Sequence, residues 1–129
     1  MSGGEHFCTA LGFVARTILP LTGNPVPTLP RSSDRAVIKT LAVDMRAVLN
    51  DPRPVDFAGA DVRTISHIAG EAELTQSGAE YALLYTLPNA YFHLTMGYAT
   101  LRMTGVLVSK ADLDGVHQYA PDTRFTVDV

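Results

Sequence analysis

Residues 77–105 read SGAEYALLYTLPNAYFHLTMGYATLRMTG. Ser77 and Glu80 stand three residues apart, the spacing of a capping box, in which each side chain accepts a hydrogen bond from the other residue's backbone amide. This pair predicts a helix that begins after Ser77 and reaches Leu87. Pro88 lacks an amide hydrogen, so it either kinks this helix or begins a new one.

The strongest helix of the chain is predicted from Pro88 to Thr104. Gly105 follows it and suits the residue just beyond a helix C-terminus. Apolar side chains occupy most of its sides, with Tyr91, Leu94, Tyr98 and Leu101 on one side and Phe92, Met96, Ala99 and Met103 on another. Because a helix that is apolar all round is usually buried, we expect it to be the central helix of the fold.

Two more helices are predicted in the first half of the chain. Apolar residues spaced by three and four indicate a helix from His6 to Leu21. A second helix is expected to begin after Ser33 or Asp34, either of which can cap it, and to run to about Leu49. Residues 22–32 between these helices are rich in proline and predict an irregular connector.

A small β-hairpin is predicted between Val62 and Thr75. The segment is rich in β-favouring residues, and Ala69–Gly70 is a candidate turn. Because an isolated hairpin is only marginally stable, this one should lie against the helices. The tail Val116–Val129 is polar and irregular, and the sequence does not place it.

The length of 129 residues predicts a single domain over residues 1–129. Hydrophobic residues make up 47% and charged residues 18% of the chain, which is apolar for a soluble domain. A chain of this kind either has a large core or covers apolar surface with a partner.

Charge and cysteine content limit the kinds of partner and the cellular compartment that we expect for the protein. The net charge is −3, and the 10 basic residues are scattered, which argues against a nucleic-acid partner. The single cysteine, Cys8, excludes an internal disulfide and fits a reducing compartment. The longest mostly apolar stretch, Tyr81–Met103, contains Pro88, Asn89 and His93, so no membrane span is expected. We therefore expect a soluble, cytoplasmic protein that contacts neither nucleic acid nor membrane.

The segment Tyr81–Gly105 resembles the signature of a family of domains of unknown function, number nineteen ninety-three, in the DinB-like superfamily. The shared pattern is Leu-Pro-Asn, then aromatic residues, a histidine, Tyr-Ala-x-Leu-Arg and a closing glycine. The resemblance continues through the residues Phe57, Gly59, Ala60, Asp61, Lys110, Asp112 and Leu113. It covers Phe57–Gly115 strongly and Asp34–Val48 weakly, where Leu41–Met45 resembles a Leu-Ala-Pro-Asp-Met segment of the family.

The resemblance implies a mainly α fold, an antiparallel helical bundle of the DinB-like four-helix type. In the family, a second and most of a third long helix precede the segment that corresponds to Phe57. Here only Leu49–Asp56 spans that gap. We therefore expect a truncated bundle that carries a short β-hairpin and lacks central helices.

The wider superfamily is similar to metal-dependent enzymes in which three histidines hold the ion, two of them spaced i and i+4 on one helix. His93 matches the second of these two positions. Asn89 stands at the first position and is a poor ligand for zinc or nickel, and the third ligand would come from a missing helix. The alternative for His93 is a core histidine that is hydrogen-bonded to Asn89, one turn earlier.

Three other residues are candidates for a site. For each of them an ordinary structural role competes with the functional one. His67 is a further possible ligand, or a solvated position of the hairpin. Asp44 is a possible functional carboxylate, or an exposed helix residue that pairs with Arg46 or Lys39. Tyr98 is a possible acid, or a packing residue with a wet hydroxyl.

The remaining histidines, His6 and His117, lie near polar chain ends and carry no signal. The chain contains no phosphate loop, nucleophile elbow or His-Glu-x-x-His motif. The sequence thus predicts a small bundle protein that forms a homodimer, without assignable catalysis or a cofactor. The alternative is a metal-dependent transferase or hydrolase of the DinB-like type with a degenerate zinc or nickel site. No substrate or small-molecule ligand is specified by either reading, so whether the protein is an enzyme stays open.

Overall fold

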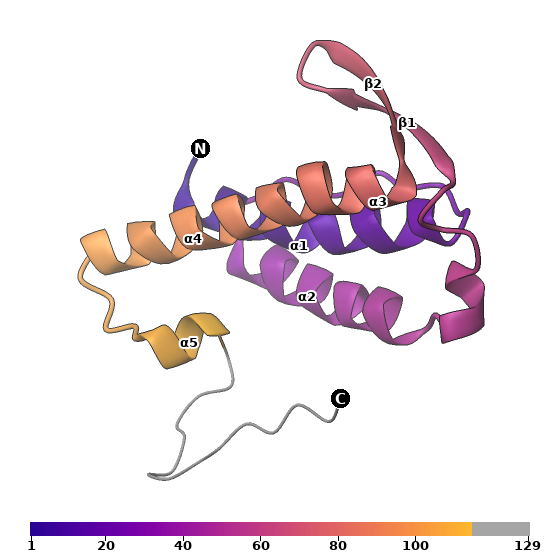
Figure 1. Cartoon of the computed structure of the whole chain (residues 1–129). Helices are drawn as coiled ribbons and strands as arrows, with labels where there is room; N and C mark the ends of the chain where they lie inside the picture. The colour runs from indigo at the N-terminus through magenta and orange to yellow at the C-terminus, as the bar shows by residue number, and fades with distance from the viewer. Residues whose placement is uncertain (115–129) are drawn as a thin grey trace, which may run out of the picture.

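The computed structural model describes residues 1–114 and is mainly helical with one two-stranded antiparallel sheet, as predicted (Figure 1). The α-helices are α1 (Gly3–Leu21), α2 (Arg35–Asn50), α3 (Gly78–Glu80), α4 (Leu87–Met103) and α5 (Lys110–Asp114). The other elements are the 3-10 helix η1 (Pro54–Phe57), the π-helix η2 (Tyr81–Thr86), and the strands β1 (Thr64–Ala69) and β2 (Ala72–Ser77). The tail Val116–Val129 lies outside the described residues.

Local signals set both ends of α1, which ends at the predicted Leu21 but begins before the predicted His6. Ser2 and Glu5 form a capping box, so the helix begins at Gly3, three residues before the predicted His6. At its end Gly23 adopts a φ of +76°, which favours glycine, and donates its amide to the carbonyl of Pro20. The amide of Asn24 donates to the carbonyl of Leu19 at 2.8 Å, which completes a Schellman motif. The chain then leaves the helix and continues as the irregular connector.

The second helix is capped as predicted and buries one face, with Leu41 and Met45, against α1. Asp34 accepts hydrogen bonds from the amides of Ala36 and Val37, which confirms it as the N-cap of α2. The main hydrophobic core lies between α1 and α2 and contains Cys8, Ala15, Leu41 and Met45.

The central helix is α1, because it packs against both α2 and α4 while those two helices barely touch each other. In Figure 1, α2 and α4 accordingly flank α1. The contact of α1 with α4 is close at Gly97, where an added Cβ would lie 3.0 Å from the ring of Phe7. Small residues at such crossings let two helix backbones approach each other.

The prediction of a buried, central helix from Pro88 to Thr104 is wrong. In α4 only Gly97 is buried, whereas Tyr91 is 66% and Met103 is 88% exposed. The helix is apolar on most sides, as its sequence indicates. Periodicity, however, does not distinguish a helix that its own chain encloses from a helix whose apolar sides stay exposed.

The predicted hairpin is present and lies over the start of the long third rod, which consists of α3, η2 and α4 (Figure 1). Thr64 pairs with Ser77 and Ala69 with Ala72, so the turn is Gly70–Glu71, one residue later than predicted. Gly70 has a φ of +64°, which suits glycine in a two-residue hairpin turn.

The rod begins as predicted and then contains a π-helix that the sequence does not reveal. The Ser77–Glu80 capping box is confirmed at its start. The amide of Leu87 donates to the carbonyl of Ala82, five residues earlier, which is the π-helical pattern. Pro88 lies in the first turn of α4, directly after the π-helix, and the backbone is helical on both sides of it, so Pro88 does not begin a separate helix.

Candidate functional site

The predicted candidate His93 is paired with a second histidine, His6. Their Nδ1 atoms lie 2.9 Å apart, and the two residues come from α4 and α1, 87 positions apart in sequence. In such a bond one ring carries the proton on Nδ1 and the other accepts it, so at least one ring is neutral. His6 was not predicted as a site residue. The predicted helix from His6 to Leu21 already placed His6 two turns before Phe13, which also contacts His93, but nothing in the sequence pairs this helix with α4.

The environment of His93 favours its neutral form. Its ring stacks on Phe13 at an interplanar angle of 19° and meets the edge of Phe92. Burial lowers the pKa of His93, and the positive charges of His6, Arg16 and Arg31 lower it further. A neutral imidazole is the form that can act as a metal ligand or as a hydrogen-bond acceptor.

Asn89 does not pair with His93, so the predicted i, i+4 hydrogen bond between them is wrong. The side-chain amide of Asn89 instead donates to the carbonyl oxygen of Tyr85 at 2.7 Å. This bond turns the amide back along its own helix and leaves His93 to find its partner on α1.

A second group of side chains forms where the hairpin meets η2. Pro20 has no amide hydrogen, so the carbonyl oxygen of Arg16, four residues earlier, lacks its usual helical partner. The hydroxyl of Tyr81 donates to this oxygen at 2.6 Å and replaces the missing bond. Burial raises the pKa of Tyr81, followed by the effect of Tyr85, which keeps the hydroxyl protonated as a donor.

His67 belongs to this second group, and the prediction of a solvated hairpin position for it is wrong. Its ring is half-buried, with its centroid 4.8 Å from that of Tyr81 and 4.3 Å from that of Tyr85. Its Nε2 bonds to Oε1 of Gln76 at 2.8 Å, and its Nδ1 is buried without a hydrogen-bond partner among residues 1–114. The alternating strand pattern indicated which side chains share a face, but not that this face lies on η2.

The rings of the second group border a cavity of about 250 Å³, here called the hairpin cavity. Its lining residues are Arg16, Val26, His67, Ile68, Tyr81 and Tyr85. The guanidinium of Arg16 lies 5.2 Å from the centre of the Phe13 ring, a cation–π distance. Phe13 contacts both Tyr85 and His93, so one ring links the lining of the hairpin cavity to the histidine pair.

The other two predicted candidates lie apart from these groups. Asp44 is exposed on α2, and within residues 1–114 neither Arg46 nor Lys39 forms an ion pair with it. Tyr98 donates to the carbonyl of Val108 at 3.4 Å and accepts from Arg102, so its hydroxyl links α4 to the segment that leads into α5.

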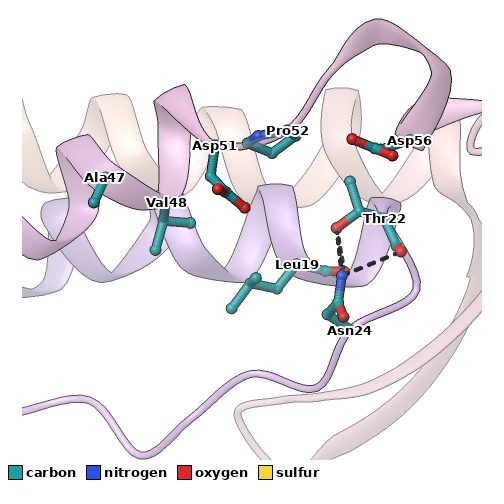
Figure 2. A pocket seen from close by; sticks show the side chains of 8 residues that line it. All are labelled: Leu19, Thr22, Asn24, Ala47, Val48, Asp51, Pro52 and Asp56. Atoms are coloured by element: carbon teal, nitrogen blue, oxygen red, sulfur yellow. Dashed lines mark hydrogen bonds between the residues drawn. The ribbon is translucent and has the colours of Figure 1, made fainter.

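A larger cavity, with a volume of about 590 Å³, lies at the C-terminal end of α2. Figure 2 shows its lining, which consists of Leu19, Thr22, Asn24, Ala47, Val48, Asp51, Pro52 and Asp56. Two of its polar groups are engaged locally, because Asn24 donates to Thr22 and Asp56 pairs with Arg53 at 3.1 Å. None of the predicted site residues lies in it.

The donor set for a metal is incomplete in the described part of the chain. Residues 1–114 contain no cluster of three or more His, Cys, Asp or Glu side chains that could hold an ion. His6 and His93 supply two imidazoles, and Asn89 is turned away. Of the helices described, none is long and apolar enough to cross a membrane.

Comparison with known proteins identifies the class of this bundle. A solved structure of a DinB family member protein from Shewanella denitrificans matches with a TM-score of 0.78 and 26% sequence identity. The match covers 92% of this chain and 67% of that chain, so about a third of the Shewanella protein has no counterpart here. No curated protein matches the chain.

The family is likewise established. The model of the family described as Domain of unknown function (DUF1993) matches residues 6–113, and the chain therefore belongs to this family. The match extends over α1, which the recognisable sequence pattern did not cover. The predicted relationship to DinB-like DUF1993 domains is thus confirmed.

Proposed function

We propose that this protein is a small helical-bundle unit that pairs with a second copy of itself through α4 and the apolar groove beside it. The groove has a volume of about 350 Å³ and lies where α2 and α4 diverge on the two sides of α1. Its lining residues are Phe7, Ala10, Leu11, Val14, Ile38, Ala90, Tyr91 and Leu94. Apart from the hydroxyl of Tyr91, these side chains offer no hydrogen-bonding group.

The composition of α4 supports an interface at this place. Residues 81–101 contain no Asp, Glu, Lys or Arg. The cores of protein interfaces are depleted in charge and enriched in aromatic residues and methionine, and α4 exposes Tyr91, Phe92 and Met96. Exposed apolar side chains that gather on one element often mark a site of association.

A second copy is the occupant that the shape of this face favours. A two-fold dimer requires one surface to carry both a hollow and the group that fills it. Tyr91 lies at the edge of the groove and is two-thirds exposed, so the Tyr91 ring of each copy can enter the groove of the other. The partner would then cover apolar side chains of α4 that this chain leaves exposed.

Replacing Tyr91 with arginine tests this proposal. The parent protein should sediment with twice its chain mass of 13.9 kDa at about 100 µM. Tyr91→Arg should weaken the dimer at least about tenfold, because it places a charge in an apolar contact. Sedimentation equilibrium with light scattering measures both masses.

Val43→Arg is the matched control, since Val43 is 70% exposed on α2 and lies outside the groove. It should leave the dimer intact. A monomeric parent, or a Tyr91→Arg protein as dimeric as the parent, would rule out self-association through this face.

A metal-dependent transferase or hydrolase of the DinB-like type is the second candidate, favoured by the His6–His93 pair. Two neighbouring imidazoles from different helices are a partial ligand set for zinc or nickel. The set is one ligand short in the described residues, so no reaction step is derived from it.

Elemental analysis of the purified protein distinguishes this candidate. If it holds, the parent should carry about one zinc or nickel ion per chain, His93→Ala should lose it, and His67→Ala should retain it. A parent with far less than one metal per chain after zinc loading and desalting argues against the metal enzyme. In that case, the same measurement on Asn89→His tests whether a third imidazole is enough to create metal binding.

A further inference from the structure

We propose that the hairpin cavity is a binding site for a small planar carboxylate. This proposal does not depend on dimerisation, because the lining residues are distinct from those of the apolar groove. It also differs from a metal site at His6 and His93, neither of which borders the cavity.

Arg16 gives the cavity a positive charge with no acidic partner. The cavity lining contains no Asp or Glu, and among residues 1–114 no ion pair engages Arg16. The cation–π contact with Phe13 limits the positions that the guanidinium can take. Arginine binds carboxylates through two parallel hydrogen bonds, so a positioned and unpaired guanidinium favours an anion of this shape.

The rings of His67, Tyr81 and Tyr85 make the rest of the lining suitable for a flat ligand. These three rings are in mutual contact, with centroids between 4.3 and 5.8 Å apart. Val26 and Ile68 add apolar edges. Aromatic faces stack on planar groups, and a volume of about 250 Å³ admits a ligand with a single ring.

Hydrogen bonds hold these walls in place before any ligand arrives. Gln76 bonds to the imidazole of His67 from the neighbouring strand. Tyr81 bonds to the backbone of Arg16, which ties η2 to the helix that carries the guanidinium. A site whose walls are already ordered loses little entropy on binding. The π-helix at this point is consistent with a binding site, since π-helical turns are frequent at functional sites.

His67 has a buried ring nitrogen without a hydrogen bond within the described part of the chain, which a role in packing alone does not explain. Its buried Nδ1 has no hydrogen-bond partner in the described structure, although a phenylalanine would give the same aromatic wall without a polar atom. Proteins tolerate such losses of stability more often where a residue serves a function.

Titration with benzoate tests the proposed site. Benzoate should shift the amide signals of residues around Arg16, His67 and Tyr85 in nitrogen-proton NMR spectra, with a Kd on the order of 1 mM or below. Benzylamine, which has the same ring and the opposite charge, should bind at least about tenfold more weakly.

Arg16→Met should weaken benzoate binding at least about tenfold, whereas Arg46→Met, an exposed arginine on α2, should leave it unchanged. Arg16 is exposed, so its replacement should leave the fold intact, and a circular dichroism spectrum verifies this. His67→Leu should also weaken binding, through loss of the flat wall. The proposal is wrong if benzoate does not bind at about 10 mM, if benzylamine binds equally well, or if Arg16→Met binds like the parent.

Discussion

Gly78→Ala is expected to destabilise the fold by about 3 kcal/mol or more, the upper range for overpacking a tight contact. A Cβ at this position would overlap the carbonyl oxygen of Ala60 and would lie 3.1 Å from a methyl group of Leu21. The overlapped atom belongs to the backbone and cannot rotate away. The amide of Ala79 also donates to the carbonyl of Asp61 at 3.0 Å, which holds the two segments together.

A loss of stability in Gly78→Ala would be the opposite of the usual effect of replacing glycine with alanine in a helix. Gly78 opens α3 without a positive φ, and at an open helical position alanine is more stable than glycine by up to about 1 kcal/mol. Urea unfolding followed by circular dichroism measures the difference.

Gly59→Ala is the matched control for the contact at Gly78. Gly59 has a φ of +71° and nothing within 4 Å of an added Cβ, so its substitution should cost only backbone strain, about 1 kcal/mol. A Gly78→Ala protein that loses no more stability than Gly59→Ala would show that the backbones separate easily.

Leu41→Ala is expected to lower the free energy of unfolding by about 3 kcal/mol. Leu41 is 3% exposed and lies in the core with Cys8, Ala15 and Met45. Its removal loses the transfer energy of the side chain and leaves a void that α1 and α2 can only partly close. Thermal and urea unfolding should agree on the loss.

Leu49→Ala provides the comparison, because Leu49 lies on the same helix and is 57% exposed. Its replacement should cost less than about 1 kcal/mol. Similar losses for Leu41→Ala and Leu49→Ala would mean that the α1–α2 contact does not form the main core.

The elements with local signals could be predicted from the sequence, because those signals require only neighbouring residues. Asp34 caps α2, Ser77 and Glu80 form the expected capping box, and the hairpin register is shifted from the predicted turn by only one residue. The family resemblance also identified the bundle, because the pattern around Pro88 and His93 is specific.

The candidate site could be predicted only in part, because its contacts join distant segments. The sequence identifies His93, but its partner His6 comes from 87 positions earlier, and His67 is oriented by a hairpin that packs on η2. A π-helical turn also has no distinct residue pattern, so the placement of Tyr81 and Tyr85 could not be anticipated.

The bond between Tyr81 and the carbonyl of Arg16 has a consequence for how the molecule opens. Pro20 weakens the last turn of α1, which would ordinarily fray by itself. Since a buried residue 65 positions away now completes that turn, it cannot open without breaking a contact of η2. The C-terminal turn of α1 and the start of the long third rod therefore belong to one cooperative unit, and their amides should become accessible to hydrogen exchange together.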